Sequence, residues 1–194
     1  LLKFIFKLTS IKEKSNYLLN SMANLIYSAG VLLYSKSIDQ TPYFLLGKDW
    51  DNKWSNFGGR CELSDKSDHE ITALREAWEE TLGCVYDYDQ FKNVFKGKSS
   101  HPCINCKTPS GTPYYLYIIK IPFSNNYRDR FLSTKKFISN INIDKKFSEI
   151  NDVKWVSFDT IKYNIDSKRS FIKLRSIFEK TIKDNIEFID EVIS

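Results

Sequence analysis

The chain has 194 residues, of which 42% are hydrophobic and 27% are charged, with a formal net charge of +5. This apolar content is enough for one core at this length, so a single domain is expected. No apolar run approaches the roughly 18 residues of a membrane-spanning helix, which excludes a transmembrane protein of that kind and any membrane partner.

The first predicted elements in chain order are a terminal extension and a pair of strands. The only methionine is Met22, and the sequence from there reads like a natural start, so residues 1–21 are predicted to be an N-terminal extension. Residues 24–35 and 43–47 are rich in β-branched and aromatic side chains and flank a turn, which predicts a hairpin. The domain itself is expected to cover residues 22–183.

Residues 58–83 hold the densest group of acidic side chains in the chain. They begin with Gly58 and Gly59, a pair that permits a tight backbone path. Seven acids follow: Glu62, Asp65, Asp68, Glu70, Glu76, Glu79 and Glu80. The second half has apolar residues at steps of three and four, which predicts an amphipathic helix. These apolar residues are Ile71, Leu74, Ala77, Trp78 and Leu82.

On this helix Glu76, Glu79 and Glu80 fall on the face opposite the apolar stripe. Like charges at such spacing repel each other, which costs helix stability unless a cation lies beside them. Arg75 precedes Glu79 by four residues and can hold that carboxylate from the next turn. Hard divalent cations prefer oxygen ligands, so this face is predicted to bind Mg²⁺ or Mn²⁺. The alternative interpretation is an ordinary solvated acidic face.

The glycine pair and the string REAWEETLG, which starts at Arg75, together resemble the Nudix box, written G-x5-E-x7-R-E-U-x-E-E-x-G-U with U a bulky apolar residue. The R-E-U-x-E-E part matches in full, although Ala77 is small for its position. Counting from Gly59, the sixth residue is Asp65 rather than Glu, and Arg75 arrives two residues late. The closing Gly83 follows one residue later than in the pattern. These departures concern the loops at either end of the helix.

The resemblance implies a Nudix pyrophosphohydrolase, in which water attacks phosphorus in a nucleoside diphosphate linked to another moiety. It implies that Glu76, Glu79, Glu80 and the backbone carbonyl of Gly59 bind the metal, with Mg²⁺ or Mn²⁺ as the cofactor. Glu76 and Glu79 are further implied in activating water, and Arg75 in orienting a glutamate. The expected substrate is therefore a small nucleotide-type molecule or a similar polyanion.

Downstream of the box the sequence predicts further strands and helices. Residues 92–99 and 113–122 are expected to be paired strands, residues 125–140 a short helix, and residues 152–158 another strand. Residues 167–183 have apolar side chains at helical spacing and are expected to form a packing helix. Residues 184–194 are treated as a C-terminal tail. Strands on both sides of a central helix predict the α/β class, with a mixed β-sheet between helices. The Nudix resemblance implies the same α/β/α sandwich.

Three residues near the glycines are predicted to contact substrate. Trp54 and Phe57 precede the glycines and could stack on a base, although capping of the core is the competing interpretation. Arg60 directly follows the glycines and completes the predicted set. Basic side chains elsewhere would steer a polyanionic substrate towards the acidic cluster.

Glu149 lies on the segment before the last predicted strand, and its carboxylate is a candidate general base for the attacking water. An exposed surface glutamate is the competing interpretation. The stretch from Glu149 to Trp155 is similar to E-I-x-x-x-x-W in mRNA-decapping Nudix enzymes, which makes RNA a second candidate partner. Diphosphoinositol phosphates are a further substrate candidate. A non-catalytic nucleotide-binding domain is disfavoured because all three helical glutamates remain. No oligomeric state is predicted.

The four cysteines do not form the framework of a small secreted protein. Cys103 and Cys106 resemble half of a zinc site with His101 nearby, but no second ligand pair follows, so they are interpreted as reduced loop cysteines. With no targeting signal recognised, a cytoplasmic location is expected.

Overall fold

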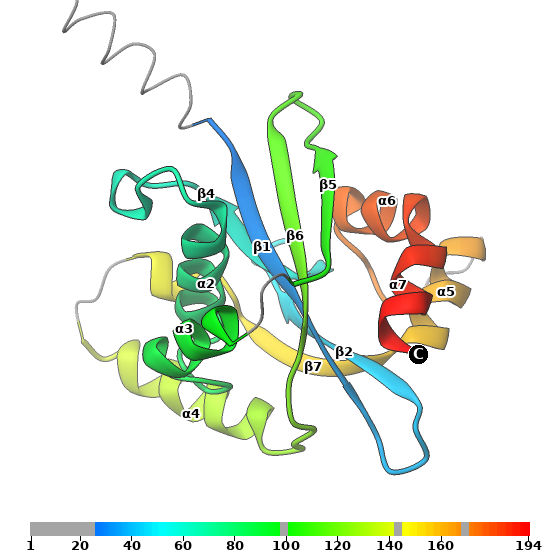
Figure 1. The fold of residues 1–194 in the computed structure, drawn as a ribbon. Coiled ribbons are helices and arrows are strands. Elements are labelled where there is room, and N and C mark those ends of the chain that lie inside the picture. Colours follow the sequence, from blue (N-terminus) through cyan, green and yellow to red (C-terminus); the bar gives the residue numbers. More distant parts are fainter. Residues whose placement is uncertain (1–25, 98–100, 142–144, 168–170) are drawn as a thin grey trace, which may run out of the picture.

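A computed structural model describes residues 26–97, 101–141, 145–167 and 171–194 (Figure 1). The predicted extension, residues 1–21, lies outside the described residues, as do Met22 and the start of the first predicted strand.

A seven-stranded mixed sheet forms the centre of the molecule. Its strands are β1 (Ser28–Lys36), β2 (Pro42–Lys48), β3 (Trp54–Ser55), β4 (Phe57–Arg60), β5 (Cys103–Lys107), β6 (Pro113–Lys120) and β7 (Asp152–Ser157). The spatial order is β3-β2-β1-β6-β5, and β4 and β7 pair with β1 and β2 respectively. Only the β1–β6 pair is parallel among the named pairs of the described chain.

The central strand β1 supplies side chains to both faces of the sheet. Ala29, Val31 and Leu33 join one buried cluster, whereas Leu32 and Tyr34 join the other. Successive side chains of a strand point to opposite faces, so a continuous apolar run is required where both faces are covered.

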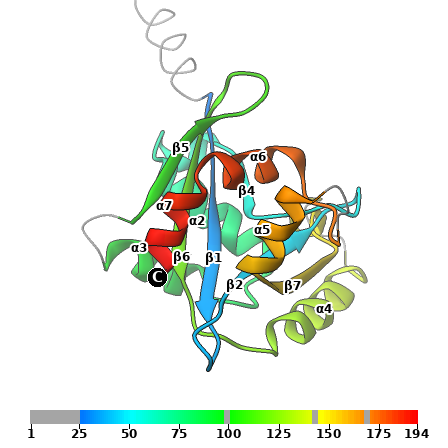
Figure 2. The same cartoon turned by 90° about the vertical axis from the view of Figure 1, so that its right-hand side faces the viewer.

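Helices cover the two faces of the sheet, as Figures 1 and 2 show. One face carries α2 (His69–Glu80), α3 (Tyr88–Lys96) and α4 (Tyr127–Ile138). The other carries α5 (Phe158–Asp166), α6 (Ser176–Asp184) and α7 (Ile186–Ile193). Two short 3₁₀ helices, η1 (Leu63–Asp65) and η2 (Lys145–Ser148), lie in the connections. The predicted mixed sheet between helices is therefore confirmed.

The ends of α2 are fixed by local chemistry. Asp68 caps the N-terminus, where its carboxylate accepts from the backbone N–H groups of Glu70 and Ile71 at 2.9 and 3.3 Å. After the helix, Leu82 and Gly83 both adopt left-handed conformations, with φ of 53° and 64°. Two consecutive left-handed residues stop the helix, which explains why the closing glycine of the motif appears one residue late.

The strand predicted for residues 92–99 is wrong, because residues 88–96 form helix α3. Asp87 and Gln90 cap its N-terminus reciprocally, each side chain accepting from the other's backbone N–H. Phe91 and Phe95, one helical turn apart, are both buried. The strand that pairs with residues 113–120 is instead β5, which begins at Cys103.

The last third of the chain differs from its prediction in two ways. The packing helix predicted for residues 167–183 begins only at Ser176, and Leu174 forms an isolated bridge with Trp54. The segment predicted as a tail, residues 184–194, is largely helix α7, in which Ile189 and Ile193 are buried. Their burial completes the apolar layer beneath α5 and α6.

The cysteine pair lies in a strand rather than a loop. Cys103 and Cys106 are three residues apart in β5, and they pack against opposite clusters of the sheet. They therefore cannot share a metal ion, and none of the four cysteines forms a disulfide in the described part of the chain. Among the described residues, no helix has both the length and the apolar character that crossing a bilayer requires.

Candidate active site

Arg75 is a buried cation surrounded by the acids of the motif. Its Nε and Nη2 donate to the two carboxylate oxygens of Asp65, each at 3.0 Å. Its Nη1 lies 3.0 Å from Glu79 Oε2 and 2.9 Å from Glu76 Oε1. The backbone carbonyl of Arg60 accepts from Nη2 at 2.8 Å. The ion pair predicted between Arg75 and Glu79 is thus present, within a larger network that also ties α2 to β4.

Asp65 reaches Arg75 because of the longer loop before α2. Lys66 and Ser67 both have positive φ, and this left-handed turn returns the chain towards the helix. Burial disfavours ionisation of Asp65, but hydrogen bonds from Arg75, the Glu62 N–H and Thr72 hold its pKa below the ordinary value. In the sequence, Asp65 stands out only as a departure from the motif. In the structure it is the bidentate partner of Arg75.

Glu79 and Glu80 are buried, at 2% and 7% exposure, which excludes the interpretation of this face as solvated. Glu80 Oε2 accepts from the backbone N–H of Gly58 at 2.6 Å. Burial, followed by the charges of Glu76 and Glu149, raises the pKa of Glu80 well above its ordinary value. The environment on the glycine side of the cluster therefore disfavours the ionised form of Glu80.

The pKa of Glu76 is raised as well. Burial raises its pKa to about 7, and the charges of Glu79 and Glu149 add to this effect, although Arg75 opposes it. A methyl group on Gly59 would lie 2.5 Å from Glu76 Oε1, so only glycine lets the strand approach this carboxylate so closely.

This donor set fits a hard divalent cation. Carboxylate oxygens of Glu76 and Glu80 and the backbone of β4 are the ligand types that Mg²⁺ and Mn²⁺ prefer. A bound cation would also stabilise the ionised form of both carboxylates, whose pKa values are raised mainly by burial and further by neighbouring carboxylates. In the described part of the chain, no three His, Cys, Asp or Glu side chains already converge as a finished ligand set. Binding would therefore involve rotation of these side chains.

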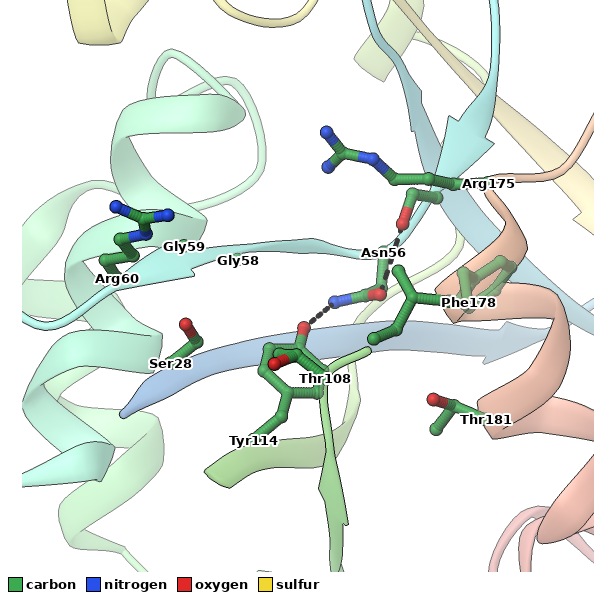
Figure 3. Close-up of a pocket in the computed structure, with 12 residues that line it drawn as sticks. Ser28, Asn56, Gly58, Gly59, Arg60, Thr108, Tyr114, Arg175, Phe178 and Thr181 are labelled. Atoms are coloured by element: carbon green, nitrogen blue, oxygen red, sulfur yellow. Dashed lines mark hydrogen bonds between the residues drawn. The ribbon is translucent and has the colours of Figure 1, made fainter. Parts of the chain in front are cut away.

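A cavity of about 180 Å³ adjoins the glycine side of the cluster (Figure 3). Its lining residues are Ser28, Ser55, Asn56, Gly58, Gly59, Arg60, Thr108, Tyr114, Arg175, Ile177, Phe178 and Thr181. Asn56 Nδ2 donates to the Tyr114 hydroxyl at 2.6 Å across its floor. Figure 3 places Arg60 and Arg175 on different sides of the hollow, beside the glycine strand. Two guanidinium groups next to a hydroxyl-rich lining suit a phosphate-bearing ligand.

Two of the residues predicted to contact substrate, Trp54 and Phe57, do not line the cavity. Phe57 is fully buried beneath α2, so its ring cannot stack on a ligand. Trp54 is 8% exposed, and the Lys154 ammonium covers its ring at 4.2 Å from the centroid. Both aromatic residues therefore serve the core, because alternation along β3 and β4 turns them inward. Arg60 is exposed and lines the cavity, as expected of a substrate contact.

Glu149 is exposed and lies in the connection between η2 and β7. Its charge raises the pKa of both Glu76 and Glu80, which places its carboxylate in the same electrostatic environment. The structure thus brings together Gly59, Arg75, Glu76, Glu79 and Glu80 of the residues predicted as catalytic or metal-binding, and Glu149 influences Glu76 and Glu80 through its charge.

Asn56, Tyr114 and Arg175 were not identified from the sequence. Asn56 precedes the glycines by two residues, but Tyr114 and Arg175 lie 58 and 119 positions further along the chain. Only the parallel pairing of β6 with β1 and the packing of α6 place them beside the glycines.

No protein-family model matches the sequence, and no curated protein matches it. Solved structures with a similar chain path include the Ap4A hydrolase of C. elegans, at 14% identity over 85% of this chain and 98% of that chain, with a TM-score of 0.45. RenU, a Nudix hydrolase of M. smegmatis, is 13% identical over 86% and 87% of the two chains, with a TM-score of 0.47. A Nudix hydrolase of Alicyclobacillus acidocaldarius is 10% identical over 82% and 90%, with a TM-score of 0.46. Function is therefore argued from the residues of this chain.

Proposed function

We propose that the chain is a divalent-metal-dependent pyrophosphohydrolase of the Nudix type. One observation carries this proposal above the others. Glu76 and Glu80 are partly or fully buried, have raised pKa values, and adjoin a cavity flanked by two arginines. Arg75 contacts Glu76 but also binds Asp65 and Glu79, so these buried carboxylates are only partly neutralised. Such groups are costly to bury and concentrate at functional sites.

The site residues would divide into three roles. Glu76, Glu79, Glu80 and the Gly59 carbonyl would hold Mg²⁺ or Mn²⁺. Bound there, a divalent cation supplies charge that stabilises the phosphoryl oxygens and favours ionisation of water. Arg75 keeps Glu79 in place through the 3.0 Å contact between Nη1 and Oε2.

Glu149 is the proposed general base. Its exposed carboxylate stands beside the cluster without an ion pair to a lysine or arginine of the described chain, so it can accept a proton from water. The water oxygen forms a bond to one phosphorus of the pyrophosphate as the bridging P–O bond breaks. The second phosphate leaves with the bridging oxygen, and Glu149 retains the proton until it is lost to solvent.

Arg60 and Arg175 are proposed to bind the remaining phosphates of the substrate. Each guanidinium can form two parallel hydrogen bonds with a phosphate, and their position beside Gly58 and Gly59 would direct the anhydride towards the glutamates. A nucleoside diphosphate linked to another moiety, or a similar polyanion, has the charge that this arrangement recognises.

A second candidate function is hydrolysis of diphosphoinositol phosphates, because the cavity favours hydroxyl and phosphate groups. Five hydroxyl-bearing residues line it, namely Ser28, Ser55, Thr108, Tyr114 and Thr181. The largest apolar side chain in the lining, Phe178, is only 1% exposed and offers no ring face for a base. The case for capped RNA is weaker because Tyr114 is the one partly exposed aromatic residue in this lining, whereas recognition of single-stranded bases relies on aromatic stacking.

A phosphate-release screen tests the proposal. The purified chain would be supplied with nucleoside triphosphates, dinucleoside polyphosphates, ADP-ribose, diphosphoinositol phosphates and capped RNA, each with Mg²⁺ or Mn²⁺. We expect metal-dependent turnover of one class, lost in Glu80→Gln and kept in Glu70→Gln, which changes the first turn of the same helix outside the cluster. Silence across the panel, or equal activity in Glu80→Gln, would contradict the proposal.

A further inference from the structure

One ammonium group from another element binds the segment that carries Glu149 at three points. Lys135, in the last turn of α4, donates through Nζ to the Ser148 carbonyl at 3.4 Å, to Asn151 Oδ1 at 2.9 Å, and to the Ile150 carbonyl. These acceptors lie on both sides of Glu149 in the sequence. An ammonium has three N–H donors, and here all three are directed at one short segment.

The surroundings of Lys135 make its ammonium group dependent on these hydrogen bonds. Its ammonium lies 5.3 Å from the ring centroid of Trp50 and 6.0 Å from that of Phe131, so it is partly removed from water. Within the described residues no carboxylate lies in ion-pair distance of it. Desolvation of the unpaired charge is disfavoured unless its hydrogen bonds are satisfied, and the segment 148–151 satisfies them.

The same segment is fixed on its other side by β2. The Asn151 N–H donates to the Lys48 carbonyl at 2.7 Å, and Asn151 Nδ2 donates to the Asp49 carbonyl at 3.4 Å. Asp49 in turn approaches Arg175 of the cavity, with 3.6 Å between Oδ2 and Nε. Residues 148–151 are therefore clamped between α4 and the end of β2, and the Glu149 side chain remains free to project from the clamp.

We infer that Lys135 is a positioning residue, which keeps Glu149 beside Glu76 and Glu80 by binding the backbone on both sides of it. This inference rests on the proposed function for its catalytic consequence, but the clamp itself is a property of the metal-free protein. Without Lys135, the segment would lose its hydrogen bonds to α4 while its contacts with β2 remain, and the Glu149 carboxylate would sample positions away from the cluster. A general base acts only within hydrogen-bond reach of its proton, so the catalytic rate would fall while substrate binding would not.

The clamp is tested by amide hydrogen exchange in the metal-free protein. The variants are Lys135→Met, which keeps the aliphatic stem and loses the donors, and Lys136→Met, a matched control that removes an exposed lysine one position along. We expect exchange in residues 148–151 to be about tenfold faster in Lys135→Met, with β7 unchanged, and no change in Lys136→Met. Unchanged exchange in Lys135→Met would overturn the inference.

A double-mutant cycle tests the route through Glu149. With the substrate found in the screen, we expect Lys135→Met to lower kcat about tenfold at constant KM, and Glu149→Gln to lower it about a hundredfold. In the Glu149→Gln background, Lys135→Met should then change kcat by less than about twofold. An undiminished tenfold loss in that background would overturn the positioning role. Failure of the wild-type chain to turn over any substrate would count against the proposed function alone, and hydrogen exchange would then decide the clamp.

Discussion

The two ends of the acidic cluster differ in how their charge is stabilised. At the Arg75 end, Asp65 receives two guanidinium hydrogen bonds and its pKa is lowered. At the glycine end, the pKa values of Glu76 and Glu80 are raised, although Arg75 also contacts Glu76. Arg75 lies within ion-pair distance of Glu62, Asp65, Glu76 and Glu79, and its single charge cannot neutralise all four carboxylates. We infer that the Arg75 end maintains the fold, whereas the glycine end is suited to a cation that binds from solution.

The largest expected effect is at the Arg75 end. Arg75→Met leaves Asp65 buried and without its cation, and we expect it to lower the free energy of unfolding by about 3–5 kcal/mol. Arg128→Met is the matched control, because Arg128 pairs with Asp152 while its side chain is 53% exposed. That loss should stay below about 1 kcal/mol. Urea unfolding at pH 7 measures both changes, and similar losses in the two variants would show that Arg75 stabilises the fold no more than an exposed ion pair does.

The glycine end predicts an unusual dependence on pH. The pKa of Glu76 is raised from 4.5 to about 7, so the folded state binds its proton more tightly than the unfolded state. The stabilisation is complete below pH 4.5 and is lost as the pH rises through 7. The contribution of Glu76 to the stability of the metal-free protein should therefore fall by about 3 kcal/mol between pH 4.5 and pH 8, and the raised pKa of Glu80 acts in the same direction. Glu76→Gln should flatten this decline in urea titrations, and a wild-type stability that rises over the same window would contradict the assignment.

Substitutions at Gly58 and Gly59 are expected to have smaller effects on stability. A Cβ on Gly58 would meet the Gly30 Cα at 2.7 Å, so Gly58→Ala should cost about 1–3 kcal/mol of stability. A Cβ on Gly59 meets only the end of the Glu76 side chain, which can rotate away. Gly59→Ala should therefore cost less than about 1 kcal/mol and still weaken Mn²⁺ binding. Thermal unfolding and a Mn²⁺ titration of both variants separate the effects, and the idea fails if Gly59→Ala binds Mn²⁺ normally.

The sequence allowed the central helix and the fold class to be predicted because these depend on local periodicity. Apolar steps of three and four identified α2, and the i to i+4 spacing identified the contact between Arg75 and Glu79. Helix α3 was missed because the predicted strand began at residue 92, which left out Phe91 and the reciprocal cap of Asp87 and Gln90 that marks the helix start.

The remaining site residues depend on contacts that local patterns do not encode. Asp65 reaches Arg75 only through a left-handed turn at Lys66 and Ser67, which non-glycine residues rarely adopt. Arg175 reaches the cavity through the packing of α6. The donors of Lys135 meet their acceptors across the junction of α4 and β7, where no periodic pattern exists.

We propose that the glycine end binds a divalent cation. A calorimetric Mn²⁺ titration of the wild-type chain and of Glu80→Gln measures this binding. At pH 6.5 the raised pKa values mean that binding must displace protons, so the apparent enthalpy should vary with the ionisation enthalpy of the buffer. We predict Mn²⁺ binding with proton release by the wild-type chain and at least tenfold weaker binding by Glu80→Gln. Equal affinity in the two proteins, or no binding by the wild-type chain, would contradict the account.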